Sequence, residues 1–339
     1  MSSGNSRRED GVRHRLWENG VIQVLVPMAP PLLQMNGYVL RDEDGGLTVV
    51  DPGPRSRESE KVWEEVLREL GASWKAVKQI VVTHHHPDHY GLAGWLQEHS
   101  GCRVWMSKRA HAEAELMWGP ASVMESALPA FFARHGMPPQ QTAELKEHQA
   151  GIWPAISPQP EVSHVESARS FAMGGREWLP VETGGHAAGH LSFFHPGSGQ
   201  LLCGDAVLPQ ISPNVSLLPG SDPEPLRTFM DGLSRLRELP ARTAFPGHRE
   251  PFGYFADRID RLLLHHEERL DAAESLLADG PRSGYEVCGE LFRGRITGIH
   301  QLRFAMSEAL AHLVELERRG RAFLEEKNGE IRFFRIDGC

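Results

Sequence analysis

Four side chains that can bind metals occur within six positions, directly after a short apolar run. We interpret the run Ile80-Val81-Val82 as a buried strand, and the side chains that follow are His84, His86, Asp88 and His89. Side chains at a strand end are held in a fixed direction by the scaffold behind them. Imidazole and carboxylate groups at this spacing favour two metal ions side by side, zinc first and then iron or manganese.

His85 lies between these candidate ligands in the sequence. Side chains alternate in direction along a strand end, which predicts that His85 points away from the metals. We interpret it as a structural residue or as one that supports the ligands, and not as a ligand itself. The alternative interpretation is a polar loop with scattered histidines. Further ligand-type residues downstream argue against that alternative.

Three more polar residues follow strand-like runs and have glycine beside them, which lets the backbone come close to a crowded centre. They are His186 in Gly185-His186-Ala187-Ala188-Gly189-His190, Asp205 in Leu202-Cys203-Gly204-Asp205, and His248 in Pro246-Gly247-His248. Two sets of ligands can then be formed. One metal would be held by His84, His86 and His186, the other by Asp88, His89 and His248, with Asp205 as a bridge.

The size and composition of the chain are those of a globular protein. Its 339 residues allow a large core and two domains, and 40% are apolar and 24% charged. No apolar run reaches the roughly 18 residues of a transmembrane helix, and the polar N-terminus lacks a signal-peptide pattern. The four cysteines are far apart, which predicts reduced thiols in a cytoplasmic protein. The net charge of −9 gives no general attraction to nucleic acid or anionic membranes.

The periodicity of apolar residues places the candidate ligands at strand ends. Residues 1–12 indicate a flexible arm. We expect strands at 21–26, 37–40, 47–50, 80–82, 178–181, 192–194, 200–203 and 243–245, helices at 59–70, 92–99 and 224–239, and turns at Asn36-Gly37 and Asp44-Gly45-Gly46. This order predicts sheets covered by helices on their outer faces.

Residues 106–165 carry apolar residues at helical spacing together with several prolines, which predicts a helical insertion. Its methionine and aromatic side chains, among them Trp118 and Phe132, have two interpretations. They pack onto the core, or they form a lid over the metal site and shape its entrance.

The last part of the chain has a different pattern. A long helix at 254–278, another marked by Leu302 to Leu316, and two strands around Asn328-Gly329 predict a winged-helix module at 255–339.

The ordered motifs between about residues 22 and 250 resemble those of the metallo-beta-lactamase superfamily. The resemblance implies an α/β fold, a four-layered αββα sandwich at 13–254 with the metals at one edge. The ligand pattern is similar to that of binuclear hydrolases such as glyoxalase II, and it favours His186 over His190 as the ligand. Asp205 argues against class B beta-lactamases, because those enzymes mostly lack this bridging aspartate. Flavodiiron relatives usually carry Glu where this chain has His86, which argues against redox chemistry. Residues 255–339 resemble the winged-helix extension of the beta-lactamase-like protein 2 family, which includes an endoribonuclease acting on single-stranded RNA.

The site predicts hydrolysis by a hydroxide shared between two divalent metals, which attacks a carbonyl carbon or a phosphorus. Asp88 is expected to bind a metal and also to orient the nucleophile or accept its proton. Asp51, Thr83 and His190 are candidates for holding the ligands, with plain turn and strand-end roles as the alternative for Asp51 and Thr83. Asn214 and Arg249 either face the substrate pocket or have turn roles.

Two functions remain open, a small-molecule hydrolase for an ester, thioester or lactone, and an endoribonuclease. Residues 253–339 contain thirteen Lys and Arg against sixteen Asp and Glu, a net charge of −3. A nucleic-acid-binding module is expected to be basic, so we favour the small-molecule hydrolase. The C-terminal module would then close the pocket or pair two chains into a homodimer. The alternative depends on a cationic cluster made by Arg293, Arg295, Arg303, Arg318, Arg319 and Arg321.

Overall fold

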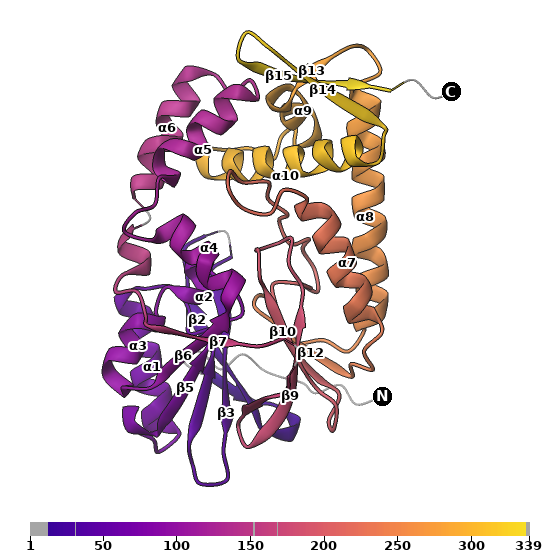
Figure 1. The fold of residues 1–339 in the computed structure, drawn as a ribbon. Helices are drawn as coiled ribbons and strands as arrows, with labels where there is room; N and C mark the ends of the chain where they lie inside the picture. The colour runs from indigo at the N-terminus through magenta and orange to yellow at the C-terminus, as the bar shows by residue number, and fades with distance from the viewer. Residues whose placement is uncertain (1–12, 31, 152, 168, 337–339) are drawn as a thin grey trace.

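The computed structural model describes residues 13–30, 32–151, 153–167 and 169–336, so the predicted arm at 1–12 lies outside the described residues. The chain forms a mixed α/β fold with two large sheets and a small C-terminal one (Figure 1). The first sheet has strands in the order β1 (His14–Leu16), β2 (Val21–Pro27), β3 (Gln34–Arg41), β4 (Leu47–Val50), β5 (Val77–Val81), β6 (Arg103–Ser107) and β7 (Val162–Val165). The second has the order β12 (Thr243–Pro246), β11 (Gln200–Gly204), β10 (Leu191–His195), β9 (Arg176–Glu182) and β8 (Phe171–Met173).

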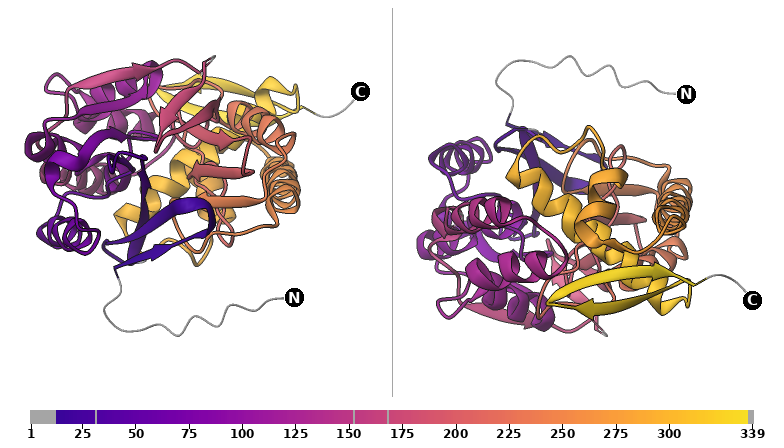
Figure 2. Two further views of the ribbon diagram at one scale, coloured as in Figure 1. Left: turned by 90° about the horizontal axis from the view of Figure 1, so that it is seen from below. Right: turned by 90° about the horizontal axis from the view of Figure 1, so that it is seen from above.

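Helices occupy the outer sides of these sheets and the end above them (Figures 1 and 2). Those of the first half are α1 (Arg57–Glu69), α2 (Pro87–Tyr90), α3 (Ala93–Ser100), α4 (Lys108–Trp118), α5 (Met124–Arg134) and α6 (Pro139–Ala150). Those of the second half are α7 (Pro225–Arg237), α8 (Phe255–Leu276), α9 (Gly284–Leu291) and α10 (Ile299–Arg318). Short 3-10 turns are η1 (Glu18–Gly20), η2 (Trp74–Ala76) and η3 (Trp153–Ile156). In the described residues, no helix combines the length and apolarity needed to span a membrane.

Alternation along the strands of the first sheet builds a core on each of its faces. Val49 and Ile80 belong to the cluster that contains Trp63 of α1. The next residues, Val50 and Val81, join the cluster that contains strand residues of the second sheet, such as Phe193. Because successive side chains point to opposite faces, strands buried on both sides must be apolar at every position. The predicted covering of the sheets by helices agrees with this packing.

The turn predicted at Asn36-Gly37 is wrong, because both residues lie inside β3. A Cβ at Gly37 would lie 2.9 Å from the carbonyl oxygen of Asp51 and 3.0 Å from the Trp63 ring, so glycine permits a close approach here. The Asn36 side chain donates to the carbonyl oxygens of Pro246 and Arg249 at 2.9 and 2.6 Å. Asn-Gly therefore joins the two sheets at this point. The turn predicted at 44–46 is confirmed, since β3 and β4 pair antiparallel across it.

The segment at 106–165 is helical in its middle and extended at its ends. Helices α4, α5 and α6 fill it, whereas β6 and β7, which pair in parallel, run into it from both sides. Trp118 and Phe132 are both buried in the main apolar core, which agrees with the packing interpretation for these two side chains. Trp118 also donates its Nε1–H to the carbonyl oxygen of His85 at 3.0 Å. The segment thereby supports the loop that follows β5.

The C-terminal part contains α8, α9, α10 and a three-stranded sheet in the order β13 (Arg282–Ser283), β15 (Glu330–Arg335) and β14 (Ala322–Lys327). The hairpin predicted at Asn328-Gly329 is confirmed, and both residues have positive φ, 54° and 80°. Helix α10 lies across the end of the molecule, between the α5–α6 pair and α8 (Figure 1). This position places α10 above the loops that leave the strand ends.

Replacing Trp118 with Phe is expected to lower the free energy of unfolding by about 1–3 kcal/mol, because it leaves the buried carbonyl of His85 without its donor. Denaturant unfolding of the purified protein measures the change. Trp105→Phe is the matched control, since it makes the same change of ring size on a strand residue for which no indole hydrogen bond is described. Equal loss of stability in both variants would contradict the role given to the hydrogen bond.

Candidate metal centre

The loop after β5 and the loop after β4 are joined through one carboxylate. The two strands pair in parallel, with Val50 opposite Val81, so Asp51 and Thr83 leave the sheet at the same edge. The Asp51 carboxylate accepts from the backbone N–H and from the Oγ1–H of Thr83, both at 2.7 Å. It also accepts from Nδ1–H of His89 at 2.9 Å. A buried carboxylate needs such donors, and here they fix the start and the end of the loop.

The remaining candidate ligands come from the corresponding edge of the second sheet. His186 lies in the loop between β9 and β10, Asp205 follows β11, and His248 follows β12. Strands β11 and β12 are parallel, with Gly204 opposite Pro246, so the residues after them emerge together. A Cβ at Gly247 would collide with the Asp205 carboxylate and the His89 ring, and glycine at this position keeps the centre open.

All seven predicted ligands are brought together in this structure. Ligand atoms of His84, His86 and His186 lie within 4.8 Å of one another, as do those of Asp88, His89 and His248. Nε2 of His84 and Nδ1 of His86 are 3.0 Å apart, close enough to bind the same ion.

Asp205 lies between these two groups. Its Oδ2 is 3.6 Å from Nε2 of His186 in the first group and 3.4 Å from Nε2 of His248 in the second. Its Oδ1 is 3.5 Å from Nε2 of His89. Each carboxylate oxygen therefore faces an imidazole nitrogen of a candidate ligand.

Hydrogen bonds at Nδ1 select one tautomer for four of the histidines. His89 donates to Asp51, and His84 has Thr83 Oγ1 at 2.9 Å, whose own hydrogen is directed to Asp51. The carbonyl oxygens of Asn214 and Gln34 lie 2.8 and 3.4 Å from Nδ1 of His186 and His248. Because these acceptors take a hydrogen from Nδ1, the Nε2 lone pair of each ring is left for a metal.

His190 contacts the candidate ligands without being one of them. Its Nε2 accepts from the backbone N–H of Asp205 at 3.1 Å, and its Nδ1 is 2.7 Å from Thr183 Oγ1. Burial lowers its pKa to about 3, which keeps the ring neutral and able to accept. His190 therefore positions the backbone that carries Asp205.

The electrostatics of the site couple buried imidazoles to buried carboxylates. Burial, and then neighbouring imidazoles, hold the pKa of His84 and His86 well below the usual value. At His248 burial acts downward, but the charges of Asp205 and Asp88 outweigh it and raise the pKa to about 10. Protons and metal ions therefore compete for the same nitrogen atoms.

The donor set fits divalent metal ions. Within the described part of the chain, Nε2 of His89, Nε2 of His186 and Oδ1 of Asp205 are buried and have no hydrogen-bond partner. Buried polar atoms without partners cost free energy unless something else binds them. Three lone pairs that converge on one centre are satisfied together by bound cations.

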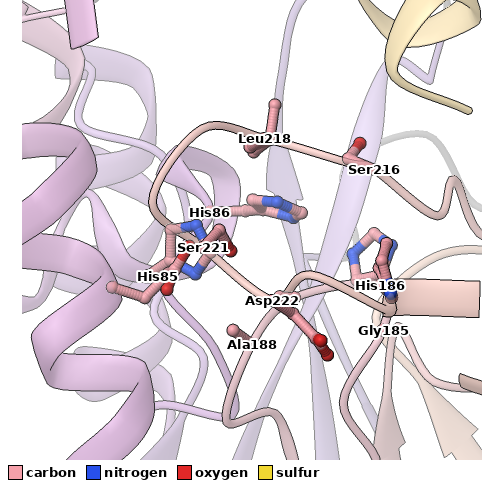
Figure 3. A pocket seen from close by; sticks show the side chains of 12 residues that line it. His85, His86, Gly185, His186, Ala188, Ser216, Leu218, Ser221 and Asp222 are labelled. Atoms are coloured by element: carbon pink, nitrogen blue, oxygen red, sulfur yellow. The ribbon is translucent and has the colours of Figure 1, made fainter. Parts of the chain in front are cut away.

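Two cavities lie beside the ligands. A small one of about 10 Å³, enough for about one water molecule, is lined by His85, His86 and His186 together with Glu113, Ser221 and Asp222 (Figure 3). A larger groove of about 1060 Å³ shares Ala188, Ser221 and Asp222 with it. The groove thus adjoins the small cavity through these three residues, and none of the seven candidate ligands lines the groove itself.

Sequence reasoning missed part of the surroundings. His85 is buried as a structural residue should be, but neither ring nitrogen has a hydrogen-bond partner among the described residues. Asn214 holds His186 through its backbone oxygen while its side chain donates to Glu308 of α10 at 2.8 Å. No sequence pattern marks a backbone acceptor, and a contact across 94 residues has no local signal. Arg249 also contributes a backbone oxygen, to Asn36.

Comparison with known proteins assigns both parts of the chain. Residues 30–248 match the metallo-beta-lactamase superfamily, and residues 270–336 match the metallo-beta-lactamase-like C-terminal domain. A probable metallo-hydrolase from Bacillus subtilis is 27% identical over 309 residues, 88% of this chain and 92% of that protein. A hydroxyacylglutathione hydrolase from Idiomarina loihiensis is 26% identical over 195 residues, 58% of this chain and 53% of that protein.

Two solved structures are similar over nearly the whole chain. A metallo-beta-lactamase family protein from Thermus thermophilus is 32% identical, with a TM-score of 0.81 and coverage of 94% of this chain and 99% of the other. A beta-lactamase domain protein from Burkholderia ambifaria is 32% identical, with a TM-score of 0.84 and coverage of 95% and 94%. With a matched sequence over most of its length and a matched fold, the chain belongs to the metallo-beta-lactamase superfamily.

Proposed function

We propose that this chain is a hydrolase with two divalent metal ions, and the observation that carries the proposal is the position of the Asp205 carboxylate between two histidine-rich groups. The first ion would be held by His84, His86 and His186 and the second by Asp88, His89 and His248, with Asp205 bridging them. Imidazole nitrogen and carboxylate oxygen suit zinc first, and iron or manganese next. The likeness to a probable metallo-hydrolase supports this assignment.

Bound divalent ions supply Lewis acidity and a water of lowered pKa. The residues of the chain supply position and proton transfer. Asp88 has a side chain 24% exposed, whereas that of Asp205 is 7% exposed. We therefore propose that Asp88 orients the attacking water and accepts its proton, and that His248, whose Nε2 lies 3.2 Å from Asp88, holds this carboxylate in place.

The proposed substrate is a small molecule with an ester, thioester or lactone bond. Support comes from the likeness to hydroxyacylglutathione hydrolases, whose named substrate is a thioester. The larger groove, which adjoins the small cavity lined by His86 and His186, has the size of a small-molecule site. Cys102, Cys203 and Cys288 are free thiols, which supports the proposed cytoplasmic location.

We also propose the division into a four-layered αββα domain at 13–254 and a winged-helix domain at 255–339. The packing of the two large sheets and the three-stranded C-terminal sheet support it. Five of the six arginines that would make an RNA-binding cluster are paired or buried, and the sixth, Arg295, is exposed. Arg293 pairs with Glu290, Arg318 with Glu315, Arg319 with Glu267 and Glu315, Arg321 with Asp271 and Glu274, and Arg303 is buried.

The metal content of the purified protein should be close to two equivalents per chain, and Asp205→Ala should remove at least one of them together with most hydrolysis. The reason is that the Asp205 carboxylate lies near a histidine of each group. Elemental analysis after mild purification measures the metal. Asp231→Ala, which removes an exposed carboxylate on α7, is the control. One equivalent in the wild type, unchanged by Asp205→Ala, would contradict the proposal.

Asp51→Asn should weaken metal binding by about 10- to 100-fold, since it removes the charge that orients His89 and, through Thr83, His84. Competition with a chelator that reports bound zinc by absorbance measures the change. Thr83→Ser retains the hydroxyl and should leave affinity within about threefold, whereas Thr83→Val removes it and should resemble Asp51→Asn. Unchanged affinity in Asp51→Asn would assign Asp51 a turn role alone.

The protein is expected to bind single-stranded RNA weakly at physiological salt, because four arginines of the proposed cluster are paired with carboxylates and Arg303 is buried. Fluorescence anisotropy with labelled RNA, repeated at low salt, measures affinity and its salt dependence. Submicromolar binding that falls steeply as salt rises would instead favour the endoribonuclease.

A further inference from the structure

Arg303 is a buried cation on the helix that lies over the metal centre. The residue is 8% exposed and belongs to the second turn of α10. Residues three and four apart share a helix face, so Arg303 lies on the same face as His300 and Ser307. The Ser307 side chain donates to Ser216 Oγ at 3.0 Å, and Ser216 lines the small cavity beside His86 and His186. The Arg303 face of α10 is thus turned toward the ligands.

The guanidinium of Arg303 has no acceptor among the described residues. The guanidinium lies over the ring of Phe304, at 4.8 Å from the centroid. Two other shielded arginines behave differently, since Arg258 donates to the carbonyl oxygens of Leu208 and Ile211, and Arg269 lies 3.5 Å from Glu308. A guanidinium removed from water without such partners costs free energy, which an anionic ligand would recover.

Hydrogen bonds connect the segment of α10 around Arg303 with the candidate metal centre. Asn214, whose backbone oxygen holds His186, donates through Nδ2 to the carbonyl oxygen of Phe304 at 3.2 Å. The residue next to Arg303 is therefore linked to a candidate ligand through one side chain.

We propose that Arg303 binds an anionic group of the substrate, a carboxylate or a phosphate, while the bond to be cleaved lies at the metal centre. This inference rests on the proposed hydrolase function and narrows its substrate to an acyl compound with a negative charge. The guanidinium fork matches both anions in a bidentate manner, with planar carboxylate as the simplest fit. The chain itself has a net charge of −9, so an unpaired buried cation near the site selects such substrates against the general charge of the protein.

The experiment compares two thioesters of N-acetylcysteamine that differ in one charge, succinyl and butyryl. Arg303→Met should lower kcat/KM for the succinyl thioester by about 10- to 100-fold, mainly through KM, because a charge-assisted hydrogen bond is lost. Activity on the butyryl thioester and metal content should stay within about twofold. Arg303→Lys should retain part of the preference, and Arg295→Met, which changes an exposed arginine, should retain all of it. Equal losses on both thioesters would overturn the proposal and leave Arg303 a packing role.

A binding measurement separates this inference from the hydrolase proposal. Calorimetric titration of the wild type with succinate and with inorganic phosphate, before and after metal removal by a chelator, tests the anion site alone. Binding by the metal-free wild type that Arg303→Met abolishes supports the inference even where neither thioester is cleaved, and the stronger anion identifies the chemistry. A metal-free wild type that binds neither anion overturns it.

Discussion

The carboxylate of Asp51 is the constraint on which the candidate metal centre depends. The carboxylate is buried and accepts three hydrogen bonds from two residues of the loop after β5. The backbone of Asp51 has a positive φ of 49°. A charge in that position is tolerated only while those donors stay in place, so the loop cannot relax without leaving the charge unpaired. Aspartate also tolerates the left-handed backbone conformation better than most residues. The first sheet thereby fixes the Nε2 atoms of His84 and His89 before any ion binds.

The second sheet contributes the other side of the candidate centre, again because residues that follow neighbouring parallel strands leave the sheet at the same edge. Asp205 and His248 leave β11 and β12 side by side, and His190 holds the backbone of Asp205 from behind. Gly247 and Gly37 are the points where the backbone must come close, in one case to the ligands and in the other to Asp51 and Trp63. The candidate site therefore forms where the edges of the two sheets meet, and the strands of each sheet hold its side chains in place.

The sequence was sufficient for the parts of this arrangement that have local signals. The seven candidate ligands could be found because each follows an apolar run and stands in a short motif. Asn36-Gly37 was misread, since its meaning depends on Trp63 and Pro246, which are distant in sequence. Strand β7 and the end of β6 lie inside the segment 106–165, in which helical spacing dominates. Arg303 could be named as a surface cation, but its burial depends on how α10 docks, and no residue pattern reports that.

The C-terminal module is connected to the candidate metal centre through a chain of hydrogen bonds. Glu308 of α10 accepts from the Asn214 side chain, and the backbone of Asn214 accepts from His186, so a carboxylate of one module is connected to a ligand of the other. Burial raises the pKa of Glu308, and Arg269 and Asn214 act in the opposite direction. A shift of α10 would break this connection and expose two buried side chains of opposite charge, Glu308 and Arg303. Losing these hydrogen bonds would cost free energy, which favours a single position for α10. The position of Arg303 on this helix is fixed in the same way.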